Sequence, residues 1–219
     1  MSQDIDLKQA DRKVFSASFD DGLVDIFIAS FALAFALGPF TTRFLNPHLG
    51  DLWGDFVGTL MIFLPVWGMI ILLRWVRKKY VVPRLGMVKY GPKRKRKMTT
   101  FTWIMLALNV LFLILGIAAA LVPRGPGSLI VLPFSAIVLV SFTLAAYFLD
   151  LPRFYAYGIM LGLAPIVGEW LYQQFGVPHH GYPVTFGIAS LVIFAVGLMK
   201  LITILREEPY PNEEALLQE

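Results

Sequence analysis

The chain has 219 residues, of which 57% are hydrophobic and 16% are charged. Soluble domains contain about 45–50% apolar and about 25% charged residues, and a chain of this length cannot hide such an apolar excess in one water-soluble core. The chain has no cysteine, which excludes disulfides, cysteine nucleophiles and thiolate metal sites.

Six apolar stretches follow in chain order, and each is long enough to cross a hydrocarbon core about 30 Å thick. The segment before them, residues 1–22, is polar and mixed in charge rather than built like a signal peptide, so the first stretch is expected to remain as a span. The stretches predict helices at 23–45, 56–73, 99–122, 128–149, 154–177 and 184–205. The sequence therefore predicts an all-α polytopic membrane protein with a six-helix transmembrane bundle at 23–205 and a C-terminal tail at 206–219.

The basic residues are distributed very unevenly. The segment 74–98, between the second and third predicted helices, carries eleven of the nineteen Lys and Arg residues and no acid. A cytoplasmic N-terminus leaves seventeen basic residues inside and only Arg43 and Arg124 outside. Because basic loops stay on the cytoplasmic side during insertion, the sequence predicts cytoplasmic N- and C-termini in a plasma-membrane protein.

This basic segment has two interpretations. It can recognise anionic lipid headgroups, at about 1 kcal/mol per basic residue near the surface, or it can act only as a topology signal. Nucleic-acid binding is disfavoured because the block is small and adjoins the bilayer. Residues 80–92 alternate apolar and basic residues around Pro and Gly, which favours a short hairpin on the membrane surface. The candidate lipid contacts are Arg84, Lys89, Lys93, Arg94, Lys95, Arg96 and Lys97.

Two short segments carry a resemblance to a family. They are Val82-Pro83-Arg84-Leu85-Gly86-Met87-Val88-Lys89 and Asp20-Asp21-Gly22-Leu23-Val24-Asp25-Ile26. The first resembles a loop with the pattern Tyr-Pro-Arg-hydrophobic-Gly-hydrophobic-Val in small uncharacterised multi-pass membrane proteins of bacteria and archaea. This chain has Val82 where that pattern has tyrosine. The resemblance covers about twenty residues and implies a family but no activity.

Glu169 is the clearest ionisable residue inside a predicted span. A charge at the centre of a bilayer costs at least about 2.5–3.5 kcal/mol, so such a residue needs an explanation. Tyr172 and Gln173 follow on the same helix face, and Pro165 lies one turn earlier, where it loosens the helix. The carboxylate can bind a proton or a cation in a cavity, or it can be a structural glutamate that is hydrogen-bonded within the bundle.

The remaining polar candidates lie near the two membrane boundaries. His48, His179 and His180 are expected on the outer side, where imidazole could bind a metal, although no spacing fixes two ligands on one helix. Acids at the start of the first span, Asp20, Asp21 and Asp25, suit a helix N-terminus. Asp25 has an alternative role as a partner of Arg74, Arg153 or Lys200.

The favoured function is that of a structural, regulatory or lipid-interacting membrane protein acting through its basic loop. The alternative is a small transporter or channel, working as a homo-oligomer and using Glu169. That alternative also draws on Pro65-x-x-Gly68 and Pro165-x-x-Gly168, which fall in corresponding helices of a three-plus-three inverted repeat. An enzyme is disfavoured because no catalytic constellation is evident, and no cofactor is predicted.

Overall fold

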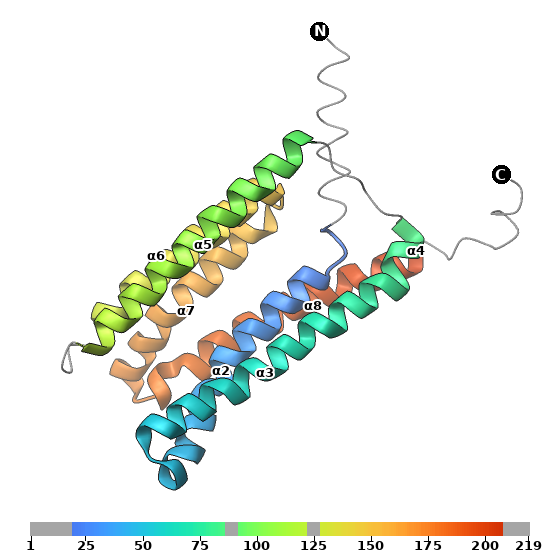
Figure 1. The fold of residues 1–219 in the computed structure, drawn as a ribbon. Coiled ribbons are helices and arrows are strands. Elements are labelled where there is room, and N and C mark those ends of the chain that lie inside the picture. Colours follow the sequence, from blue (N-terminus) through green and yellow to red (C-terminus); the bar gives the residue numbers. More distant parts are fainter. Residues whose placement is uncertain (1–18, 86–91, 122–127, 208–219) are drawn as a thin grey trace, which may run out of the picture.

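The computed structural model describes residues 19–85, 92–121 and 128–207, and this part of the chain is all-helical. Six long helices run side by side (Figure 1). They are α2 (Leu23–Leu49), α3 (Asp51–Val76), α5 (Pro92–Leu121), α6 (Ser128–Leu149), α7 (Arg153–Phe175) and α8 (Tyr182–Glu207). Short elements lie between them: the π-helical turn η1 (Arg77–Val81), the helix α4 (Val82–Leu85) and the 3-10 turn η2 (His179–Gly181).

The long helices form two groups of three (Figure 1). In one group α2 packs against both α3 and α8, and in the other α6 packs against both α5 and α7. Contact between α7 and α8 joins the groups. The resulting order in space is therefore α3, α2, α8, α7, α6, α5.

Among the described residues, five helices are long and apolar enough to cross a membrane, whereas the sequence predicts six. The five stretches are Leu23–Thr41, Arg94–Ile114, Val131–Leu149, Arg153–Phe175 and His179–Glu207. The helix that is missing from this set is α3. Several side chains in its first half lie outside the described set. Its last turn contains Arg74, and Arg77, Lys78 and Lys79 follow it in η1. No membrane is present, so the orientation of the termini stays a prediction.

Two predicted connections are more helical than expected. The sequence predicts a connection at 46–51, but only Gly50 separates the two helices. The helix α2 continues through Pro47 to Leu49, and Gly50, with φ of 79°, turns the chain. The basic segment 74–98 is also largely helical, and its described part, 74–85 and 92–98, contains no hairpin. Lys and Arg are good helix formers, so the helices extend past the apolar stretches into the charged residues.

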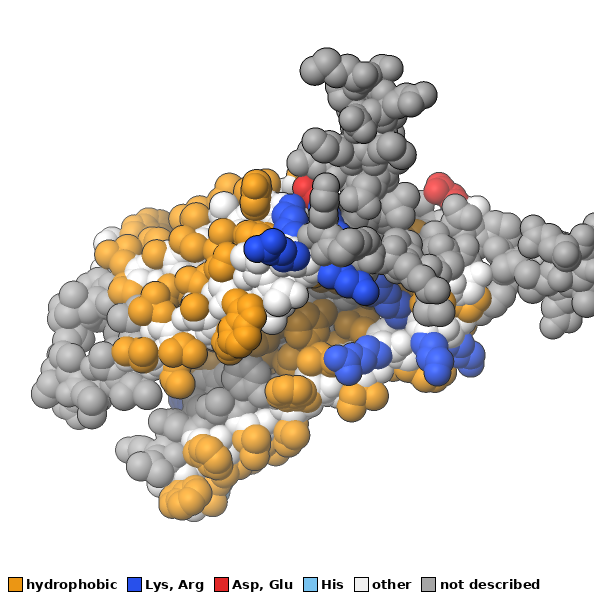
Figure 2. All heavy atoms as spheres, turned by 45° about the horizontal axis from the view of Figure 1, so that its top comes forward, with side chains coloured by type: hydrophobic (Ala, Val, Ile, Leu, Met, Phe, Trp, Pro, Cys, Tyr) orange, Lys and Arg blue, Asp and Glu red, His pale blue; other side chains and the backbone are white. Residues whose placement is uncertain are grey.

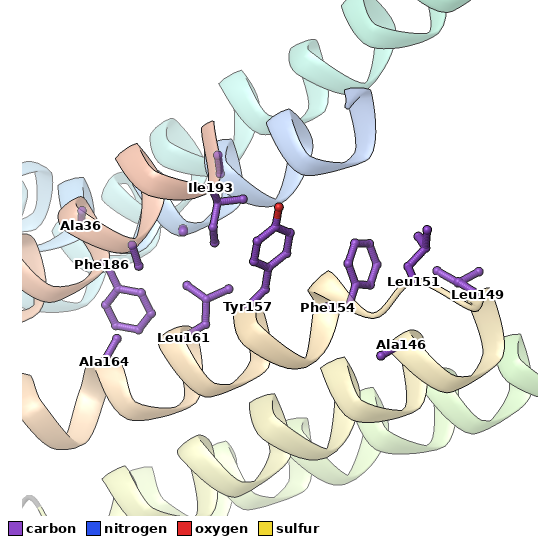
Figure 3. Close-up of a cluster of buried hydrophobic side chains, with 13 residues drawn as sticks. Ala36, Ala146, Leu149, Leu151, Phe154, Tyr157, Leu161, Ala164, Phe186 and Ile193 are labelled. Carbon is purple, nitrogen blue, oxygen red and sulfur yellow. The ribbon is translucent and has the colours of Figure 1, made fainter. Parts of the chain in front are cut away.

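The core lies where α2, α7 and α8 meet (Figure 3). Small residues on one face of α2, namely Ala29, Ala32 and Ala36, are almost fully buried and let α8 approach closely. Ile193 on α8 is completely buried. Tyr157 points from α7 toward the group that contains α2 and α8 (Figure 3). Most other large apolar side chains are exposed, as expected for helices that face lipid.

Candidate functional site

Polar side chains cluster at both ends of the bundle. We call the end with Asp20, Arg77, Arg94 and Arg153 the basic end, and the end with His48, His179 and His180 the histidine end. Successive long helices run in opposite directions. The basic end therefore contains the N-terminal ends of α2, α5 and α7 and the C-terminal ends of α3, α6 and α8. Ion pairs connect these helix ends to one another.

Glu169 lies at the histidine end, on α7, with a relative exposure of only 9%. Its Oε1 accepts a hydrogen bond of 3.0 Å from Nε2 of Gln173, one turn later on the same helix. Its Oε2 lies 2.8 Å from Nδ1 of His180. If the carboxylate is ionised it can only accept, and the His180 ring then carries its proton on Nδ1 in this contact. The structure thus brings Glu169 and Gln173 together and adds His180 to them.

The connection between α7 and α8 holds His180 in this position. His180 has a left-handed backbone with φ of 53°, as does His179 with 58°. A Cβ on Gly168 would lie 2.6 Å from the carbonyl oxygen of His180, so only glycine allows α7 to approach so closely. The His180 ring also contacts the ring of Tyr172 at 4.5 Å between centroids and stacks on Tyr182 at 5.8 Å.

The three histidines have separate neighbours. His48 contacts the ring of Phe44, His179 contacts Phe40, and His180 pairs with Glu169. Among the side chains that the structure describes, which do not include those of Asp51 and Asp55, no three His, Cys, Asp or Glu residues form a group that could hold a metal ion. The metal site at these histidines therefore stays a prediction.

Arg153 is the centre of a polar network at the basic end. Its Nε donates a 2.8 Å hydrogen bond to Oδ1 of Asp25, and one Nη donates at 2.9 Å to the carbonyl oxygen of Phe19. Its other Nη pairs with Asp20, which also pairs with Lys200. The network therefore ties the start of α2 to α7 in the other helix group and to the end of α8. Of the three partners expected for Asp25, the structure selects Arg153.

Two carboxylates in this region have no exposed surface. Asp21 and Asp25 both have 0% relative exposure. Asp21 accepts a 3.1 Å hydrogen bond from the backbone N–H of Leu23, as predicted for an acid at a helix start, and its Oδ2 lies 3.4 Å from Nε of Arg77. Burial raises the pKa of Asp21, and the nearby Arg77 guanidinium counteracts this shift only in part.

A third set of contacts involves the basic block at the start of α5. Arg94 pairs with Asp150 at 2.5 Å, and Lys97 lies 3.8 Å from the same carboxylate. Lys97 also lies over the rings of Tyr147 and Phe148. Lys95 and Arg96 are exposed. The other candidate lipid contacts, Arg84, Lys89 and Lys93, have side chains outside the described residues.

The sequence did not indicate Asp150 as a participant, nor the pairing of His180 with Glu169. Asp150 lies in the connection between two predicted helices, and His180 is predicted only as a metal ligand. The one available signal was that the predicted topology puts Asp150 on the same side as the basic block. The positive φ of Asp150, 56°, turns the chain between α6 and α7 and leaves its carboxylate near Arg94.

The two Pro-x-x-Gly motifs have different surroundings. Pro165 is buried, and Gly168 is in close contact with the connection between α7 and α8. Pro65 is exposed, and a Cβ on Gly68 would meet nothing within 4 Å. The two motifs therefore share a sequence spacing but lie in different structural environments.

An apolar pocket of about 220 Å³ lies between the two helix groups. Phe31 and Phe35 of α2 line one side, and Phe112 and Phe134 of α5 and α6 line the other. Its two polar lining residues are Asn109 and Ser141.

A scan against protein-family models and searches of curated proteins and solved structures find no match for this chain. The resemblance of the two short segments therefore stays an expectation, and function must be argued from the sites themselves.

Proposed function

We propose that this chain is an integral plasma-membrane protein with cytoplasmic termini, which binds anionic lipid headgroups at its basic end. The observation that carries this proposal is an imbalance of charge. Asp20, Asp21, Asp25 and Asp150 are each in contact with a cation of the protein itself. Exposed cations remain at the same end, and they stand close to large apolar surfaces that suit lipid.

The exposed cations come from two helices that start or end at this boundary. Arg74 and Lys78 lie at the end of α3 and in η1, and Lys95 and Arg96 lie in the first turns of α5. Among the described residues none of these four forms an ion pair. Lys and Arg side chains gather over this end of the molecule, next to a surface that is otherwise hydrophobic (Figure 2).

The N-terminus of α5 adds a second argument. Its first turn contains no acid, and basic residues occupy positions 93–97. Cations at a helix N-terminus oppose the helix dipole, at a cost of about 0.3–1 kcal/mol each. Asp150 offsets part of this cost through Arg94 and Lys97. Phosphate groups of lipids at the same boundary would offset the remainder, since anions bind well at helix N-termini.

The proposal is tested by measuring the affinity of the purified protein, in detergent micelles, for phosphatidylglycerol and for phosphatidylcholine. We expect a preference for the anionic lipid. The double substitution Lys95→Gln/Arg96→Gln should weaken phosphatidylglycerol binding about 30-fold, because each basic residue contributes about 1 kcal/mol. Arg43→Gln, an exposed arginine near the histidine end, is the matched control and should have no effect. Equal affinity for the two lipids would refute the proposal.

Glu169 supports a second candidate function, proton or cation transport. A carboxylate that is 9% exposed within a membrane-spanning stretch, and paired with an imidazole, is the type of group on which proton relays depend. In proteoliposomes, flux of protons or of a monovalent cation should be abolished by Glu169→Gln. Glu207→Gln makes the same chemical change at the other end of the bundle and should leave flux intact. Flux that survives Glu169→Gln, or no flux in the unsubstituted protein, would exclude this function.

A further inference from the structure

A cleft of about 280 Å³ lies between α2 and α3 at the basic end. Val24 and Phe27 line it from α2. Ile70, Leu73, Arg74 and Arg77 line it from α3 and η1, at a spacing that places all four on one helix face. The cleft is therefore apolar along its length and has two guanidinium groups at one end.

The position of the cleft relative to the membrane follows from one ion pair. Arg77 contacts Asp21, which lies just before the stretch Leu23–Thr41 that is apolar enough to span. Arg77 therefore lies at the membrane boundary. Arg74 lies about 4.5 Å deeper along the helix axis, at 1.5 Å per residue, within reach of the boundary for a long side chain. The apolar lining residues continue from there into the depth of acyl chains.

The two arginines differ in how they are held. The guanidinium of Arg77 is fixed between the Asp21 carboxylate at 3.4 Å and the ring of Phe19 at 5.9 Å. Arg74 is exposed and forms no ion pair among the described residues. Asp21 lies beside Arg77, and the exposed guanidinium of Arg74 adds a second positive group at the cleft. Guanidinium groups present paired N–H donors that match phosphate oxygens.

We propose that this cleft binds one anionic phospholipid, with its phosphate on Arg74 and Arg77 and an acyl chain along Leu73, Ile70 and Phe27. Charge complementarity and the order of polar and apolar lining along the membrane normal both match a phospholipid. The inference rests on the proposed lipid-binding function and deepens it, because it replaces a diffuse basic surface with one defined site.

The test uses the full chain in detergent micelles and a fluorescent phosphatidylglycerol as the probe. Arg74→Gln should raise the dissociation constant at least about tenfold, because hydrogen bonds to charged groups contribute more than a diffuse surface charge. Arg74→Lys should recover only part of the affinity, since lysine keeps the charge but loses the paired donors. Leu73→Trp should also weaken binding by filling the cleft, whereas Leu72→Trp, at the exposed neighbouring position, should not.

The possible outcomes separate the two proposals. If Arg74→Gln and Leu73→Trp bind the probe like the unsubstituted protein while the Lys95→Gln/Arg96→Gln variant does not, the cleft is refuted and lipid binding by the basic end stands. If soluble glycerol 3-phosphate displaces the probe at the probe's own concentration, the site binds a free phosphate and the phospholipid assignment fails. If the unsubstituted protein has no preference for phosphatidylglycerol over phosphatidylcholine, both proposals fail.

Discussion

Arg153 and Asp25 form an ion pair in which the carboxylate is fully buried and the arginine side chain is 15% exposed. Such a pair contributes little net stability, because removing both charges from water costs about as much as their attraction returns. Removing only one of the two partners nevertheless destabilises the protein. The remaining charge then stays buried without compensation.

Arg153→Met should therefore lower the free energy of unfolding by about 3–5 kcal/mol. Adding Asp25→Leu to this variant should recover most of the loss, because no unpaired carboxylate remains. Unfolding of the purified protein in detergent micelles measures both effects, and Arg206→Met at the exposed end of α8 is the control. Additive losses in the double variant would mean that the two residues do not act as a pair.

Asp21 makes the stability of the protein depend on pH. Its folded-state pKa is raised by burial above the ordinary 3.8, so the folded protein binds this proton more tightly than the unfolded chain does. The contribution of this group to folding stability is fully present below pH 3.8, and it is lost as the pH rises through the raised pKa. Asp21→Asn keeps an acceptor for the Leu23 N–H and removes the titration.

We expect Asp21→Asn to have a higher melting temperature than the unsubstituted protein above the raised pKa. The difference should shrink as the pH falls toward 3.8. A melting curve recorded at each pH in the same detergent measures this. A variant whose melting temperature parallels that of the unsubstituted protein at all pH values would show that burial of Asp21 does not govern its protonation.

At the scale of elements, α2 and α8 approach each other closely where Gly22 meets Gly197. Gly22 has φ of 76°, and Gly197 lies directly against it. A Cβ on Gly197 would come within 2.8 Å of the carbonyl oxygen of Gly22 and 2.9 Å of Cβ of Asp25. Ser190 adds a 2.8 Å hydrogen bond to the carbonyl oxygen of Ala29. The Asp25 carboxylate is positioned by this contact.

Gly197→Ala should destabilise the protein by about 1–3 kcal/mol, because the added methyl group meets backbone that cannot yield. Gly187→Ala is the matched control on the same helix. A Cβ there meets nothing within 4 Å, so the better helix propensity of alanine should leave stability unchanged or raise it by up to about 1 kcal/mol. Equal effects of the two substitutions on unfolding in micelles would contradict the close contact.

The helices themselves could largely be predicted from the sequence, because runs of about 20 apolar residues have few alternatives. Their ends could not. Pro47 does not stop α2, and basic residues that suggest a loop extend α3 and α5 as helix. The partner of Asp25 depended on which helices are neighbours, and no local pattern encodes that. His180 reaches Glu169 through a left-handed backbone conformation, which is uncommon for any residue other than glycine.

For the molecule as a whole, the two helix groups are joined mainly through α7. At the basic end Arg153 connects α7 to α2, and along its length α7 packs on α8. Together with the Glu169–His180 pair, these contacts place a set of paired polar residues at each end of α7. A change at either end would therefore act on the same interface between the groups.

The orientation of this bundle depends on whether α3 crosses the membrane. The chain has no cysteine, so a single introduced cysteine is the only thiol. Arg43, Lys78 and Lys95 are exposed and flank α3 and α5. In intact cells a membrane-impermeant maleimide should label Arg43→Cys, whereas Lys78→Cys and Lys95→Cys should react only after permeabilisation, because seventeen of the nineteen basic residues are expected inside. Labelling of Arg43→Cys and Lys78→Cys from the same side would show that α3 does not cross and would reduce the bundle to five spans.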